Sequence, residues 1–149
     1  MAKSRAAIGL GTEFFIGTES GSPVEIDYTS ITEAATINFA DYTVGEVDVT
    51  HLLSPDTTEE TIAGLRKTGT IEVSGNYVGD AAQQSIDTLA QARTVFPWKI
   101  TSPLSEARVL TVTGRGFINK RETGPFTPGG KTEFKFGVKV AGAIVYAVA

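Results

Sequence analysis

Apolar and polar side chains alternate along much of this sequence, which is the pattern of antiparallel β-strands with one buried face. The clearest run spans residues 131–141. A two-residue period places four of its apolar side chains on one face: Phe134, Phe136, Val138 and Val140. Glu133, Lys135 and Lys139 fall on the opposite face, which is expected to meet water or a partner.

A second long strand is expected over 108–118, where Gly114 and Gly116 mark a bulge or a close backbone approach. The loop that joins the two long strands is expected over 122–130, a segment with two prolines and three glycines. Shorter runs predict further strands over 13–17, 24–28, 35–39 and 95–101.

Two more strands, over 44–50 and 69–77, carry acidic residues on their polar faces. In the first of them, Val47 and Val49 are predicted to point into the core. The acidic side chains that the same alternation turns outward are Glu46, Asp48 and Glu72.

Residues 81–93 break the alternation and predict one amphipathic helix. Asp80 precedes it as the expected N-cap, and Gln83 follows three residues later, as in a capping box. The Ile86–Leu89 stripe is expected to pack across a sheet. The predicted fold is therefore mainly β, with two packed antiparallel sheets (a β-sandwich or barrel) flanked by one α-helix at about Ala81–Arg93.

The polar, acidic segment between Thr50 and Gly64 predicts a long loop at about 52–62, and long loops in compact domains are usually functional or mobile. The sequence shows no internal repeat and no linker. We expect a single domain over 1–149, with an N-terminal arm at 1–12 and no C-terminal immunoglobulin-like domain.

Composition narrows the function. Of the 149 residues, 41% are hydrophobic and 20% charged, a globular balance. Thirteen Lys and Arg against seventeen Asp and Glu give a net charge of −4, which disfavours a generic nucleic-acid clamp. The chain has no cysteine, which excludes disulfides, thiolate zinc sites and a cysteine nucleophile. No apolar stretch reaches the roughly 18 residues of a membrane-spanning helix.

The sequence offers little for catalysis. His51, the one histidine, ends a predicted strand and is expected to be structural or solvated. Residues 129–132 resemble the end of a phosphate-binding loop, but Pro125 stands where a glycine is required and a strand follows. Glu59 and Glu60 are adjacent in a polar loop, where nothing raises a carboxyl pKa for acid–base work. We expect no catalytic residue, no metal site, no cofactor and no enzymatic activity.

The order of the segments resembles that of a known family. Residues 46–50 (Glu-Val-Asp-Val-Thr) lead through the polar loop to 61–65 (Thr-Ile-Ala-Gly-Leu) and 68–77 (Thr-Gly-Thr-Ile-Glu-Val-Ser-Gly-Asn-Tyr). A short helix follows, then the two long strands, of which the second ends in Gly142. Over roughly residues 10–146 this resembles the tail tube proteins (major tail proteins) of long-tailed bacteriophages with non-contractile tails.

The resemblance implies a structural subunit that forms six-membered rings, which stack into a hollow conduit for double-stranded DNA during genome ejection. It implies copies of the same chain as partners, together with the tape measure, terminator and distal tail proteins. DNA would pass without specific binding, and nothing would insert into a membrane. The protein would reside in the virion tail after assembly in the host cytoplasm.

Candidate site residues follow from the strand alternation and the resemblance. The candidates for the lumen or for contacts between subunits are Glu46, Asp48, Glu72, Glu133, Lys135 and Lys139. An ordinary solvated face is the alternative at each of these positions. The candidates for a ring-stacking loop are Pro55, Asp56, Glu59 and Glu60.

Other functions remain open at this point. A ligand- or glycan-binding β-barrel module would need aromatic side chains on an accessible surface, and Trp98 is the one tryptophan. Another virion component, such as a tail terminator, or the inner tube of a secretion system would share the structural role.

Overall fold

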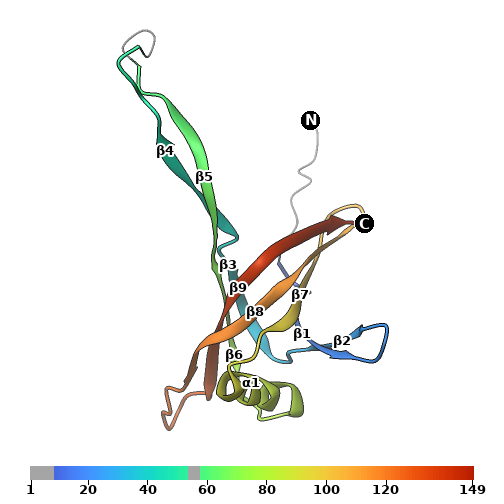
Figure 1. The fold of residues 1–149 in the computed structure, drawn as a ribbon. Helices are drawn as coiled ribbons and strands as arrows, with labels where there is room; N and C mark the ends of the chain where they lie inside the picture. The colour runs from blue at the N-terminus through green and yellow to red at the C-terminus, as the bar shows by residue number, and fades with distance from the viewer. Residues whose placement is uncertain (1–8, 54–57) are drawn as a thin grey trace, which may run out of the picture.

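The computed structural model describes residues 9–53 and 58–149 (Figure 1). Along the described residues, ten elements follow one another: β1 (Glu13–Ser20), β2 (Glu25–Ser30), β3 (Ala34–Phe39), β4 (Tyr42–Asp48), β5 (Thr61–Thr68), β6 (Thr70–Asn76), α1 (Ala81–Ala92), β7 (Phe96–Pro103), β8 (Val109–Thr123) and β9 (Glu133–Val148). The predicted fold class is confirmed: the chain is mainly β, with two antiparallel sheets and one flanking helix.

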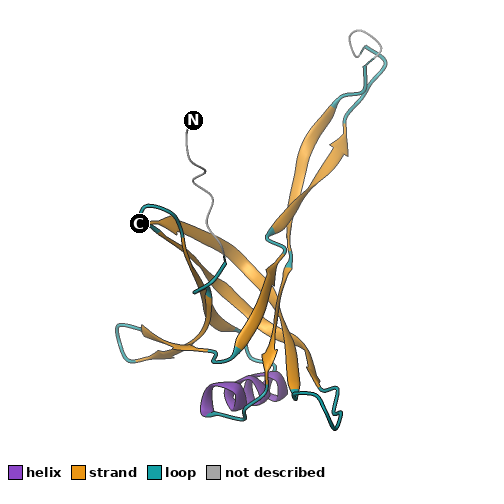
Figure 2. Ribbon diagram, turned by 180° about the vertical axis from the view of Figure 1, so that it is seen from behind, coloured by secondary structure: helices purple, strands orange, loops and turns teal. Residues whose placement is uncertain are grey.

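The two sheets differ greatly in size. Seven strands form one sheet in the order β2-β1-β7-β8-β9-β6-β3, and β4 and β5 form a two-stranded sheet by themselves. The β4–β5 hairpin projects away from the large sheet, and α1 lies at the opposite end of the molecule (Figures 1 and 2).

The large sheet rolls around its own core. Phe39 on the last strand packs edge-on against Trp98, at 5.5 Å between ring centroids, although three strands separate β3 from β7 in the sheet. Phe14 and Phe136, on β1 and β9, make a similar contact at 5.8 Å. The buried face of β9 is the one that the alternation predicts: Phe134, Phe136, Val138 and Val140.

Gly114 and Gly116 of β8 lie at a bulge and at close backbone approaches, as expected. Its pairing with β9 shifts register between Thr113 and Arg115, around Gly114. A Cβ atom on Gly114 would lie 2.8 Å from the Trp98 ring, and one on Gly116 would lie 2.5 Å from the Lys139 carbonyl oxygen. These two residues let the rolled sheet close tightly on its core.

The helix is held by one buried amide. Asp80 caps α1 by accepting a hydrogen bond from the Gln83 backbone N–H at 2.9 Å, as predicted. The Gln83 side chain does not complete the capping box. Its Oε1 accepts from the backbone N–H groups of Val78 and Gly79, and its Nε2 donates to the Thr32 and Asn76 carbonyls. Gln83 thus links the start of α1 to the ends of β6 and β2. Ile86, on the buried face of α1, is fully buried.

Several predicted boundaries are corrected. The long strands extend past 118 and 141, to Thr123 and Val148, because each strand pairs with the other beyond those points. The loop expected at about 52–62 ends earlier, because Thr61 already begins β5.

The orientation predicted for Val47 and Val49 is wrong. Their side chains are 46% and 39% exposed, because the β4–β5 hairpin stands apart from the core that was expected to cover them.

Replacing Gly114 by Ala should destabilise the fold by about 1–3 kcal/mol, because the added methyl group meets the buried Trp98 ring. Denaturant unfolding followed by the fluorescence of Trp98, the one tryptophan, measures this free energy. Gly129→Ala is the matched control, since a Cβ there has no neighbour within 4 Å. Equal stability of the two variants would contradict the packing described.

Candidate assembly surfaces

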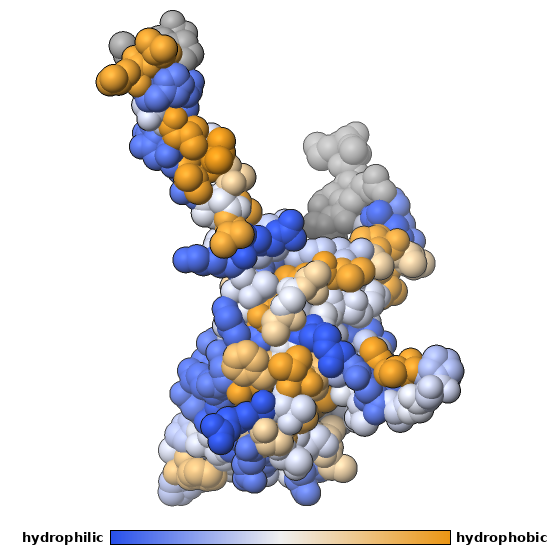
Figure 3. Space-filling view, in the orientation of Figure 1, coloured by the Kyte–Doolittle hydropathy of each residue, from blue (hydrophilic) through white to orange (hydrophobic). Residues whose placement is uncertain are grey.

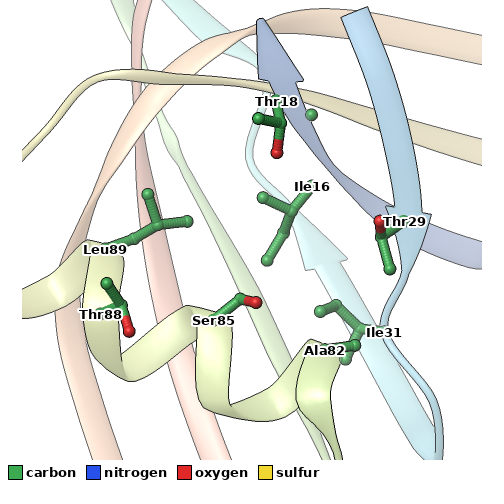
Figure 4. Close-up of a pocket in the computed structure, with 9 residues that line it drawn as sticks. Ile16, Thr18, Thr29, Ile31, Ala82, Ser85, Thr88 and Leu89 are labelled. Atoms are coloured by element: carbon green, nitrogen blue, oxygen red, sulfur yellow. The ribbon is translucent and has the colours of Figure 1, made fainter.

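The described residues offer surfaces for protein contacts more readily than a site for chemistry. Among residues 9–53 and 58–149, no group of three or more His, Cys, Asp or Glu side chains could hold a metal ion. Within the same part of the chain, no helix has the length and apolar character needed to cross a bilayer. A hollow with an apolar floor lies between α1 and the β1–β2 pair (Figure 4).

The large sheet ends on two strands that each have one partner among the described residues, β2 with β1 and β3 with β6. Antiparallel pairing alternates, so every second residue of an edge strand directs its backbone N–H and C=O outward. Ile31 N–H donates to the Phe14 carbonyl, which fixes the phase in β2: its outward residues are Ile26, Tyr28 and Ser30. Ala40 N–H donates to the Thr70 carbonyl, so β3 presents Ile37 and Phe39 in the same way.

Within the part of the chain that the structure describes, no second layer covers the β4–β5 hairpin. Its apolar side chains are largely exposed, and Figure 3 shows them as a hydrophobic stretch along the projection. At its outer end, Leu52 and Leu53 are 104% and 86% exposed. The other exposed apolar side chains of the hairpin are Tyr42, Val44, Val47, Val49, Ile62 and Leu65. An isolated two-stranded ribbon is marginally stable in water, so a surface of this kind is suited to packing against another molecule.

The base of the hairpin is anchored to the large sheet. The Tyr146 hydroxyl donates to the Asp41 carboxylate, and Lys139 Nζ donates to the Thr68 carbonyl at 2.6 Å. Thr68 Oγ1 in turn donates to the Val140 carbonyl at 2.8 Å. Gly69 is required at the crossing point, because a Cβ there would lie 1.7 Å from the Ala40 carbonyl oxygen.

The contacts at the hairpin base shift the pKa of Tyr146. Desolvation, followed by the hydrogen bond to Asp41 and the negative charge of that carboxylate, raises the pKa of Tyr146 to about 12. The nearby Arg66 opposes the shift only in part. The neutral phenol is therefore the form that holds the hairpin base.

Local hydrogen bonds order the outer end of the hairpin. Leu53 N–H donates to His51 Nδ1 at 3.1 Å, and His51 Nε2 lies 3.5 Å from Glu60 Oε2. Hydrogen bonds from Thr50 hold the pKa of Asp48 below its usual value. His51 is thus a solvated residue of the hairpin end that positions Leu53.

The predicted lumen or contact residues fall into two places. Lys135 pairs with Glu72 at 3.5 Å across β9 and β6, and Lys131 pairs with Glu133 at 3.6 Å. Lys139 is engaged by the Thr68 carbonyl. These residues share the side of the large sheet that faces away from the core, whereas Glu46 and Asp48 lie on the hairpin. Their roles in a lumen or between copies stay a prediction.

The predicted stacking loop is described only in part. Glu59 and Glu60 lie on the β5 side of the hairpin end, and Glu60 N–H donates to Thr50 Oγ1 at 2.8 Å. Pro55, Asp56 and residues 1–8 of the expected arm lie outside the described residues.

The alternation analysis missed the apolar residues at the outer end, Leu52 and Leu53, because it treated the segment as a uniformly polar loop. Two adjacent leucines within an acidic stretch were the available signal. The link from Asp41 to Tyr146 spans 105 residues and had no sequence signal.

Comparisons with known proteins find solved structures of similar architecture. No protein-family model matches the chain, and no curated protein matches it. Among solved structures, a chain of the native gene transfer agent virion superimposes with a TM-score of 0.69 at 16% identity, over 95% of this chain and 99% of that one. A chain of the empty gene transfer agent tail, computed with C6 symmetry, gives 0.67 at 17% identity, over 90% and 95%.

The SPP1 tail tube subunit superimposes with a TM-score of 0.60 at 17% identity, over 93% of this chain and 77% of that one. The chain has the fold of a tail tube protein. A chain of the six-fold symmetrised baseplate of the anti-feeding prophage is also similar, with a TM-score of 0.67 at 7% identity over 96% and 97%. The tail tube fold is thus shared across nearly the whole length of this sequence.

Tyr146→Phe should loosen the hairpin base and lower stability by about 1 kcal/mol or less, since the lost hydrogen bond is partly exposed. Because the pKa of Tyr146 is raised in the folded state, its contribution is complete below about pH 10 and is lost as pH rises through about 12.

Absorbance titration of the protein should show a late-titrating phenol that Tyr146→Phe removes. Tyr28→Phe is the control, because its described contact with Lys99 involves the ring face and survives the change. An unchanged late phase in Tyr146→Phe would contradict the assignment.

Proposed function

We propose that this chain is a non-enzymatic structural subunit of a phage tail tube. The proposal rests chiefly on a tail tube fold whose large sheet ends on two open edge strands. In this proposal residues 1–149 act as one tail-tube domain, located in the virion tail after assembly in the host cytoplasm.

Within a ring, the outward backbone groups of β2 in one copy pair with those of β3 in the next. Six copies, as in the C6 symmetry of the similar gene transfer agent tail, then form a continuous barrel. Joining sheets edge to edge satisfies the exposed N–H and C=O groups and removes the edges that otherwise promote uncontrolled aggregation.

Between rings, the β4–β5 hairpin makes the contact, since it projects from the subunit and carries the exposed apolar residues. Such a contact is heterologous, because the projecting end and the surface it meets differ. A heterologous contact that does not close on itself repeats without limit, so stacked rings extend into a tube.

The hollow that results serves as the conduit for double-stranded DNA during genome ejection. The side of the large sheet that faces away from its core supplies the candidate lining, with Glu72, Glu133, Lys135 and Lys139. The pairing of Glu72 with Lys135 reduces the positive charge available to bind phosphates, which suits passage without specific binding. The tape measure, terminator and distal tail proteins are the proposed partners at the ends of the tube.

A second candidate has an observation of its own in its favour. Similarity to a chain of the anti-feeding prophage baseplate extends over 96% of this sequence, so the inner tube of a secretion system would use the same fold. A glycan-binding module has less support, because Trp98, the one tryptophan, is fully buried.

Negative-stain electron microscopy of the concentrated protein tests the proposal. We expect hollow rings or tubes of uniform diameter. A dispersed monomer at every concentration, with no incorporation into tails when supplied to an assembling phage, would contradict the proposal.

Ile26→Pro should abolish rings, because proline removes an outward N–H of β2 without removing a hydrogen bond to β1. Ile26→Ala is the matched control, since it loses the side chain and keeps the N–H. Denaturant unfolding shows whether both variants remain folded. Ring formation by folded Ile26→Pro at the yield of Ile26→Ala would exclude the β2 edge from the ring contact.

A further inference from the structure

A pocket between α1 and the β1–β2 pair is not accounted for by the ring contact. Its volume is about 260 Å³, below the roughly 300–1,000 Å³ of typical small-molecule sites. Ile16, Ile31 and Leu89 form an apolar floor, and Figure 4 shows the side chain of Ile16 between Leu89 and Thr29. The size and lining fit aliphatic side chains better than a cofactor.

The polar side chains around this floor carry uncharged hydroxyl groups. They belong to Thr18, Thr29, Ser85 and Thr88. On the helix, Ser85 Oγ donates to the Ala81 carbonyl at 2.9 Å and Thr88 Oγ1 to the Gln84 carbonyl at 3.4 Å. The hydrogen atoms of those two hydroxyl groups are therefore engaged within the helix.

Charged side chains of both signs lie near the pocket. On β2, Asp27 lies directly opposite Thr18 and shares the strand face of Thr29. The Glu19–Arg115 pair lies on the other face of the sheet, and the Asp87–Arg121 pair lies on another face of the helix. Arg93 follows Leu89 by one helical turn and adds a positive charge at the end of α1. The outer end of the hairpin carries the opposite sign, with Glu59 and Glu60 beside its exposed leucines.

We propose that this pocket receives Leu52 and Leu53 of a second copy of this chain. The hairpin end and α1 lie at opposite ends of the molecule, so the hairpin end does not fill the pocket of its own chain (Figures 1 and 2). The contact joins the hairpin end of one subunit to the α1 end of the next. The proposal rests on the proposed function and names the surface that receives the hairpin.

The area involved indicates when this contact forms. Burying one leucine side chain contributes about 1.5–3 kcal/mol, at about 25 cal/mol for each Å² of apolar surface. Two leucines therefore remove about 120–240 Å² of apolar surface from water. A stable dimer needs about 800 Å² on each partner. Leucine insertion alone is therefore too weak to join two free subunits. It becomes effective when six copies in a ring engage together, because the later contacts are intramolecular.

Disulfide trapping tests the contact directly, because the chain has no cysteine of its own. In assembled tubes, Leu53→Cys combined with Thr88→Cys, or with Ser85→Cys one turn earlier, should give a ladder of covalent oligomers after oxidation. Leu53→Cys with Gln91→Cys is the matched control, because Gln91 is exposed on another face of the same helix, beside Asp87 and Arg121. It should give no ladder.

Leu52→Ser combined with Leu53→Ser should raise the critical concentration for tube growth about tenfold or more and leave single rings intact. Normal growth of this variant, or wild-type tubes with no ladder from either pocket cysteine, would overturn the pocket contact and leave the proposed function standing. Failure of the wild-type chain to form rings or enter tails would instead overturn the proposed function.

Discussion

Backbone groups at the two margins of the large sheet are the constraint from which the proposed assembly follows. β2 and β3 each direct alternate N–H and C=O groups away from their one described partner, and these groups must find water or another strand. Rolling the sheet brings β3 over β7 through Phe39 and Trp98, but it does not hydrogen-bond β3 to β2. The core is thus complete within one chain, whereas the hydrogen bonding of the sheet is not.

The hairpin shows the same division between a finished interior and an unfinished exterior. Its base is tied to the large sheet through Asp41, Thr68, Lys139 and Tyr146, which fixes its direction. Beyond that base it exposes apolar side chains along its length. A hydrogen-bonded base with an apolar outer part holds exposed apolar surface away from the large sheet, which suits the proposed contact between rings.

Sequence reasoning recovered the parts of the fold that depend on local periodicity. The alternation of β9 correctly predicted its buried phenylalanines and valines, and Asp80 correctly marked the start of α1. The same alternation wrongly predicted that Val47 and Val49 point into the core. A period of two shows that a strand has two faces, but it does not show whether another layer covers either face. The boundary at Thr61 was missed since the glycine and polar residues of β5 weaken its pattern.

The candidate surfaces were less accessible to sequence reasoning than the core. Which strand ends a sheet depends on pairings between distant segments, such as β6 with β9 and β1 with β7, and no local pattern encodes them. The pocket under α1 likewise combines residues 16–18, 29–31 and 82–89. The resemblance to tail tube proteins supplied the expected assembly, and the fold supplied the edges and the hairpin that can build it.

A cryo-electron microscopy reconstruction of tubes grown from this chain tests the central claim most directly. The account predicts that β2 of each copy is hydrogen-bonded to β3 of its neighbour, so that one continuous sheet encircles the bore. A tube in which both strands face solvent, with subunits joined through other surfaces, would contradict it.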